Sequence, residues 1–178
     1  MYKSSPFRYE GTPETRTIGT ALSNADLGDV TAQNSASTFT FASGTPSVSL
    51  NVGDRITFTN LSEAGNNTTY EVIGFSGTSD RVVEVSPAPT DMTTDAAWDL
   101  AIGSMAFTQA ADCYAARIAL DGAADGVAFY KTGQSPAAAS NEGVMLTAGA
   151  YEYIALQPGE RLAVAGAGGA FNFAPVGK

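Results

Sequence analysis

The chain has 178 residues, of which 44% are hydrophobic and only 15% are charged, whereas ordinary soluble domains carry roughly 25% charged residues. This composition excludes charge-driven disorder of the chain as a whole. Nine basic and eighteen acidic residues give a net charge of −9. Most of the surface would therefore repel a phosphate backbone, and we expect no nucleic acid partner.

Histidine is absent from the sequence, which removes the commonest general base, the usual activator of a serine or cysteine nucleophile, and the commonest metal ligand. We therefore expect no enzymatic activity, no metal and no cofactor. The single cysteine, Cys113, allows no disulfide within the chain, so the fold is compatible with a reducing cytoplasm. The sequence contains no apolar run typical of a signal peptide or a membrane span, and we expect no membrane partner.

Residues 1–36 show no sustained periodicity, and we interpret them as an extended N-terminal arm. Residues 1–17 hold three basic and two acidic residues, a net charge of +1, while the rest of the chain carries −10. We expect this segment to be disordered in the free protein and to become ordered on a partner. Aromatic residues and arginine are enriched at interface hot spots, which predicts these anchors: Tyr2, Phe7, Arg8, Tyr9 and Arg16.

Apolar and polar residues begin to alternate at residue 37, which is typical of half-buried strands. The pattern predicts strands over 38–41, 47–50, 55–59, 70–75 and 81–85, separated by turns rich in glycine and asparagine. Two prolines, Pro87 and Pro89, then remove backbone donors that a sheet needs. We therefore expect an N-terminal β module over residues 37–89.

Residues 90–103 are interpreted as a linker that could hold a short helix. Thr94 would cap this helix and Gly103 would end it. In that helix Asp91, Asp95 and Asp99 would share one face, which we interpret as a solvated acidic face, with cation or basic-partner binding as the alternative.

Strand patterns resume after the linker and predict a C-terminal β-sandwich module over residues 104–178. The expected strands are 105–107, 114–120, 127–131, 151–156, 161–164 and 171–173. The segment from Asp121 to Gly126 is interpreted as a hairpin turn, with a calcium loop as the alternative. The predicted fold is all-β: an extended N-terminal arm followed by two small antiparallel β modules, each barrel-like or sandwich-like.

Two blocks of the sequence resemble virion proteins of tailed bacteriophages, specifically capsid decoration (cement) and related head proteins. The first block joins residues 52–58 to 67–75, and the second joins 126–130 to 150–164. The resemblance implies a structural protein that is made in the cytoplasm of the bacterial host and lies on the capsid surface. It also implies that the protein stabilises contacts between capsomers by binding the major capsid protein and copies of itself, for instance as a homotrimer.

Three other functions stay open at this point. The first is a structural component of a phage neck or tail, because similar short β patterns occur there. The second is a carbohydrate-binding or adhesin β-sandwich, which would display a row of exposed aromatic side chains drawn from Trp98 and several of the seven tyrosines. The third is an enzyme, for which the sequence offers no nucleophile elbow and no metal-ligand spacing.

Overall fold

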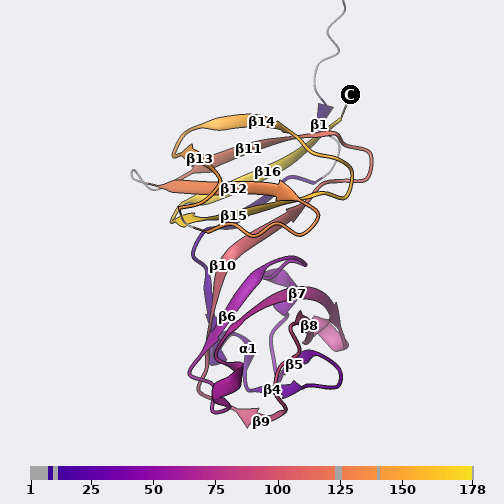
Figure 1. The fold of residues 1–178 in the computed structure, drawn as a ribbon, viewed down its shortest axis with the longest axis vertical. Coiled ribbons are helices and arrows are strands. Elements are labelled where there is room, and N and C mark those ends of the chain that lie inside the picture. The colour runs from indigo at the N-terminus through magenta and orange to yellow at the C-terminus, as the bar shows by residue number, and fades with distance from the viewer. Residues whose placement is uncertain (1–7, 10–11, 123–125, 140, 178) are drawn as a thin grey trace, which may run out of the picture. The chain divides into compact units, whose positions relative to one another are not determined.

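A computed structural model describes residues 8–9, 12–122, 126–139 and 141–177 (Figure 1). The described chain is almost entirely β-structure, with sixteen strands and one four-residue α-helix, α1 (Asn24–Leu27), which confirms the predicted all-β class. The chain divides into two compact units. The central unit is Thr20–Ala106, and the terminal unit combines the described residues up to Gly19 with those from Phe107 onward.

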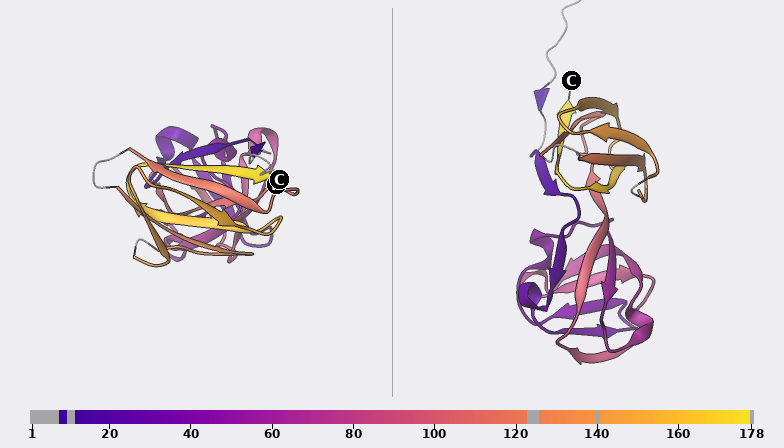
Figure 2. Two further views of the ribbon diagram at one scale, coloured as in Figure 1. Left: turned by 90° about the horizontal axis from the view of Figure 1, so that it is seen from above. Right: turned by 90° about the vertical axis from the view of Figure 1, so that its left-hand side faces the viewer.

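The central unit is built on one antiparallel sheet that curls around its own core (Figure 2). Its strands are β3 (Ala21–Ser23), β4 (Val30–Gln33), β5 (Thr38–Phe41), β6 (Arg55–Thr59), β7 (Thr69–Ser76), β8 (Val82–Ser86), β9 (Met92–Asp95) and β10 (Asp99–Thr108). Their spatial order is β3-β10-β6-β7-β8-β5-β4-β9. Short 3-10 turns at Pro46–Val48, Ala64–Asn66 and Thr78–Asp80 connect some of them.

The core of the central unit is a cluster of aromatic rings. Phe58 lies at its middle, with its ring centroid 4.4 Å from that of Phe39 and 5.8 Å from that of Trp98. Phe41 and Tyr70 complete the cluster. The indole of Trp98 is only 2% exposed and donates a hydrogen bond to the Gly28 carbonyl at 3.1 Å. Trp98 therefore belongs to the core, and the prediction that it could join an exposed aromatic row is wrong.

Buried polar side chains hold the loops of this unit. Asp54 is fully buried and accepts hydrogen bonds from the backbone of Asn51 and Ala106 at 2.9 and 2.7 Å. Asn66 is also fully buried and accepts from the backbone of Thr90 at 2.8 Å while donating to the carbonyl of the same residue. Buried polar groups are stable only when they are paired in this way.

The terminal unit is a sandwich of two antiparallel sheets, seen as two layers in Figure 1. The first sheet contains β1 (Arg8–Tyr9) and β2 (Glu14–Thr17), which both pair with β16 (Ala170–Gly177), followed by β11 (Ala115–Asp121) and β14 (Tyr151–Ala155). In the second sheet β12 (Val127–Gly133) lies between β13 (Val144–Thr147) and β15 (Arg161–Ala167).

The core of the terminal unit contains fewer aromatic rings and more small side chains. Phe107 packs on Phe171 and Phe173, with centroids 5.4 and 5.5 Å apart. Ala163 and Ala165 of β15 form a buried cluster with Ala138 from the loop after β12. Small residues permit close approach of backbones, as at Gly166 of β15, where an added Cβ would clash with the Val127 carbonyl oxygen of β12.

Several predicted boundaries differ from the structure. Part of the expected arm forms strands, because β2 pairs with β16, β3 pairs with β10, and β4 lies between β5 and β9. The prediction of disorder is therefore wrong for residues 8–9 and 14–17, which both pair with β16. Strands β2 and β3 are short and pair with segments that are distant in sequence, so local alternation gives little signal for them.

The expected linker over 90–103 also differs, because it holds β9 and most of β10 in place of a helix. An eight-residue helix is marginal alone, whereas β10 gains ladder hydrogen bonds to both β3 and β6. In addition, the strand predicted at 47–50 is not formed, because a 3-10 turn at Pro46–Val48 covers its first half and residues 49–50 lie outside any strand. The boundary predicted at residue 89 lies inside the central unit. No helix among the described residues is long and apolar enough to cross a membrane.

Candidate functional site

Large exposed hydrophobic side chains are concentrated in the terminal unit. Seven such side chains occur in the described chain, and these five belong to the terminal unit: Tyr114, Val144, Met145, Tyr151 and Tyr153. Isolated exposed apolar residues are ordinary, but clusters of them mark interaction surfaces. Four of the five lie within ten residues of sequence, on β13 and β14.

The first surface is the β13 edge, defined by Val144 and Met145. Strand β13 pairs with β12 and with no other strand that the structure describes, so one side of its backbone is left unpaired by the sheets. The side chains of Val144 and Met145 are 52% and 56% exposed. An exposed apolar edge strand is a template for pairing with another chain.

The second surface is the tyrosine face, defined by Arg117, Tyr151 and Tyr153. Tyr151 and Tyr153 are two residues apart on β14, so they project from the same side of the first sheet. Their rings are perpendicular, with centroids 6.4 Å apart. The guanidinium of Arg117 on β11 lies 5.0 Å from the Tyr151 centroid. This cation–π contact orients both side chains while leaving Tyr151 61% exposed.

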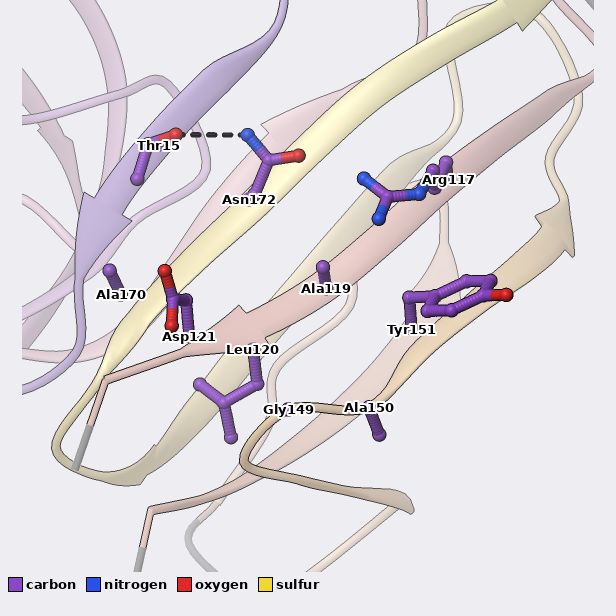
Figure 3. Close-up of a pocket in the computed structure, with 10 residues that line it drawn as sticks. All are labelled: Thr15, Arg117, Ala119, Leu120, Asp121, Gly149, Ala150, Tyr151, Ala170 and Asn172. Carbon is purple, nitrogen blue, oxygen red and sulfur yellow. Dashed lines mark hydrogen bonds between the residues drawn. The ribbon is translucent and has the colours of Figure 1, made fainter. Parts of the chain in front are cut away.

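A hollow of about 450 Å³ lies beside Tyr151 on the same sheet (Figure 3). Its floor is made by small residues, chiefly Ala119, Ala150 and Ala170. The polar side chains around it come from three strands: Thr15 from β2, Arg117 and Asp121 from β11, and Asn172 from β16. Alternation along β11 explains this placement, because Ile118 and Leu120 enter the core and leave the intervening residues on the outside.

Hydrogen bonding around the hollow leaves polar groups available. The Asn172 amide nitrogen donates to the Thr15 hydroxyl at 2.9 Å, and its other bond goes to the Glu14 carbonyl. The amide oxygen of Asn172 has no partner among the described residues. Within the same part of the chain, neither the Arg117 guanidinium nor the Asp121 carboxylate has a hydrogen bond or ion pair. The hollow therefore combines spare donors, spare acceptors and an aromatic wall.

A hydrogen bond between the two sheets supports the tyrosine face from behind. The hydroxyl of Tyr130 on β12 donates to the carboxylate of Glu152 on β14 at 2.6 Å. Burial, together with the hydrogen bond to Glu152 and its negative charge, raises the pKa of Tyr130 to about 12. Glu152 lies between Tyr151 and Tyr153 in sequence, so this bond fixes β14 while the two tyrosines point away from the core.

The predicted anchors are only partly within the described chain. Tyr2 and Phe7 lie outside it, and Arg8 and Tyr9 form β1, opposite Gly177 and Val176 of β16. The side chain of Arg16 is only 10% exposed. Its guanidinium lies 5.8 Å from the Phe107 ring centroid and 3.9 Å from a Glu14 oxygen. Arg16 is thus packed within its own unit.

The three aspartates expected on one helical face do not share a face. Asp91 accepts a hydrogen bond from the Asn34 backbone at 2.6 Å, and Asp99 accepts one from the Asn60 side chain at 2.7 Å. Asp95 accepts hydrogen bonds from the Ser62 and Ala97 backbone at 2.6 and 3.0 Å, and these bonds lower the pKa of Asp95. Each carboxylate therefore secures a different loop, and the predicted acidic face is wrong.

The remaining candidates from the sequence are a metal site and the single cysteine. The described residues contain no group of three or more histidine, cysteine, aspartate or glutamate side chains that could hold a metal. Asp125 of the alternative calcium loop lies outside those residues. Cys113 is fully buried. The signal for the tyrosine face is the spacing of Tyr151 and Tyr153, but the hollow itself depends on the register of β2, β16, β11 and β14.

Comparisons with protein-family models, with curated proteins and with solved structures gave no match to this chain.

Proposed function

We propose that the protein is a structural component of a bacteriophage virion, without enzymatic activity, that decorates the capsid surface and stabilises contacts between capsomers. Two features support the proposal: the resemblance of the two sequence blocks to decoration proteins, and the apolar edge strand in the terminal unit. The observation that carries it is the exposure of Val144 and Met145, at 52% and 56%, on a strand that has one unpaired side in the described sheets.

An exposed edge of this kind is suited to a protein partner. Backbone pairing along β13 would supply affinity, and burial of Val144 and Met145 would add about 1.5 to 3 kcal/mol for each side chain that is fully covered. The proposed partners are the major capsid protein and further copies of this chain. A ligand that binds only the assembled shell stabilises that shell by mass action, without changing the fold of its subunits.

The N-terminal residues supply a second proposed contact. Residues 1–17 carry a net charge of +1, whereas the rest of the chain carries −10. Tyr2, Phe7, Arg8 and Tyr9 are the proposed anchors there, whereas Arg16 already packs on Phe107. Contacts at two separate places would allow one molecule to bridge two capsomers.

The test compares edge variants with a matched surface variant. The double substitution Val144→Lys and Met145→Lys should abolish binding to heads of the encoding phage, because it places two charges in an apolar contact. The control is Val48→Lys in the central unit, because Val48 is 83% exposed and belongs to a 3-10 turn and not to a strand. Occupancy is measured by quantitative electrophoresis of purified particles.

Particles with and without the protein are then heated, and release of DNA is followed with a dye. Heads that lack the protein, or that carry the edge variant, should release DNA at a lower temperature. Identical release curves would contradict capsid stabilisation. Immunogold labelling of necks or tails, with no labelling of heads, would contradict capsid decoration and support a structural role in the neck or tail.

A further inference from the structure

The hollow beside Tyr151 has the chemistry of a ligand site that is separate from the β13 edge. We propose that it binds a neutral saccharide, with one sugar ring lying over the alanine floor and against the Tyr151 wall. The lining comes from β2, β11, β14 and β16 and from the 148–150 turn, and it includes neither Val144 nor Met145. The inference goes beyond capsid decoration, and its failure would leave that proposal intact.

The shape of the hollow admits a ring-sized ligand. Its volume of about 450 Å³ falls within the range of about 300 to 1,000 Å³ that is typical of small-molecule sites. Ala119, Ala150 and Ala170 keep the floor low, and Gly149 leaves space beside them. A larger side chain at any of these alanines would fill the space that the ligand needs.

The Tyr151 ring supplies an apolar surface in a fixed orientation. Sugar rings present C–H groups on their faces, and these pack favourably on the electron-rich face or edge of an aromatic ring. Tyr151 is 61% exposed yet is held by Arg117 at 5.0 Å and by the perpendicular Tyr153 ring at 6.4 Å. A side chain that is already oriented loses little conformational entropy when a ligand binds.

The polar side chains around the hollow match hydroxyl groups in number and type. Arg117 offers guanidinium N–H donors, Asp121 offers two carboxylate oxygens, and Asn172 offers its amide oxygen. None of these groups is used by another hydrogen bond in the described residues. Each sugar hydroxyl donates and accepts, so it pairs with either kind of group.

The charges of the lining favour a neutral ligand over an ionic one. Arg117 carries one positive charge and Asp121 one negative charge, and both face the same hollow (Figure 3). An acidic sugar would meet the Asp121 carboxylate, and an amino sugar would meet the Arg117 guanidinium. Like charges in a partly desolvated site are costly, so a neutral polyol satisfies both groups best.

The experiment uses the full-length chain and a printed panel of neutral, acidic and amino oligosaccharides, followed by titration calorimetry with the best neutral trisaccharide. Because the hollow is open, we expect a dissociation constant on the order of 1 mM. Tyr151→Ala should weaken binding at least tenfold. Tyr114→Ala, the matched control, removes a tyrosine of similar exposure (59%) outside the hollow and should change binding less than twofold.

Two further variants keep the proposal testable if Tyr151→Ala impairs folding. Ala119→Leu keeps every polar group but fills the floor, and it should abolish binding. Asp121→Asn should weaken binding of a neutral sugar severalfold, because an amide nitrogen replaces one acceptor oxygen. An acidic ligand would instead bind more tightly to Asp121→Asn.

Three results would overturn the inference. One is the absence of binding to any neutral sugar on the panel. Another is binding only to acidic or amino sugars, and the last is neutral-sugar binding that survives Ala119→Leu. The capsid occupancy of the Tyr151→Ala protein should match that of the unaltered protein. Loss of sugar binding by this variant is thereby distinguished from loss of capsid binding through the β13 edge.

Discussion

The hydrophobic cores of the two units are filled by different kinds of side chain. The central unit fills its curled sheet with five aromatic rings, whose neighbouring centroids lie 4.4 to 6.4 Å apart. The terminal unit has three buried phenylalanines and an alanine cluster, and it exposes Tyr151 and Tyr153. The central unit thus buries its aromatic cluster, whereas the terminal unit leaves three tyrosines on its surface: Tyr114, Tyr151 and Tyr153.

The largest expected effect comes from removing the middle of the aromatic cluster. Phe58→Ala should destabilise the central unit by about 3 to 5 kcal/mol, because a fully buried ring is lost and a cavity remains. Trp98 is the only tryptophan in the sequence and lies 5.8 Å from Phe58, so its fluorescence during urea unfolding reports this unit directly. A loss below about 1 kcal/mol would show that the cluster repacks easily.

A smaller loss of stability is expected from adding a side chain at Gly166 of the terminal unit, where there is no room for one. A Cβ added at Gly166 on β15 would clash with the Val127 carbonyl oxygen of β12, so the backbone must move to admit it. We expect Gly166→Ala to cost about 2 to 3 kcal/mol, the upper part of the range for overpacking.

The matched control is Gly103→Ala in β10, where the nearest atom to the added Cβ is 3.8 Å away. This variant should change stability by no more than about 0.5 kcal/mol. Hydrogen exchange of the β12 and β15 amides measures the first variant, and Trp98 fluorescence measures the second. If both variants lower the stability by the same small amount, close approach of the β12 and β15 backbones does not require glycine at position 166.

The smallest expected effect concerns the bond behind the tyrosine face. Tyr130→Phe removes the hydrogen bond to Glu152 and should cost about 1.5 kcal/mol near neutral pH, as for other bonds to charged groups. The pKa of Tyr130 is raised from 10.0 to about 12 in the folded protein. The protonated form is therefore favoured by folding, and its contribution is complete below pH 10 and lost as the pH rises toward 12.

The difference in stability between the unaltered protein and Tyr130→Phe should accordingly shrink over that interval. Hydrogen exchange of β12 and β14 amides at high pH is too fast, so near-ultraviolet circular dichroism during denaturant titration is the suitable measurement. Absorbance near 295 nm should show tyrosine ionisation that continues toward pH 12, because the pKa of Tyr130 is raised to about 12 and burial also raises the pKa of Tyr70. A constant difference up to pH 12 would contradict the raised pKa.

Strands with a clear alternation of apolar and polar residues could be predicted from the sequence. The strands predicted at 38–41 and 55–59 have the same bounds as β5 and β6. The strand predicted at 151–156 is one residue longer than β14. By contrast, β2 pairs with residues more than 150 positions away, and no local pattern encodes such a partner. The helix predicted from Thr94 failed for the same reason, because β3 and β6 supply the hydrogen bonds that stabilise β10.

The candidate site also has one part that the local sequence pattern predicts and one part that depends on long-range strand pairing. The exposed pair Tyr151 and Tyr153 follows from period-two spacing on a strand, which sequence can reveal. The hollow cannot be derived in this way, since Thr15 meets Asn172 only because β2 and β16 pair in one particular register. Side chains separated by 157 positions then line one concavity.

The pairing of β2 with β16 also fixes an order of events during synthesis. All residues of the central unit are contiguous, so this unit can fold once residue 106 has left the ribosome. In the described sheets strand β2 pairs only with β16, so this pairing waits until residues 170–173 emerge, more than 150 positions after β2. Completion of the terminal unit, and with it the formation of the hollow, therefore depends on the synthesis of β16. A product that stops before residue 170 would retain the contiguous central unit but lack β16, so Thr15 would have no Asn172 beside it and the hollow would not form.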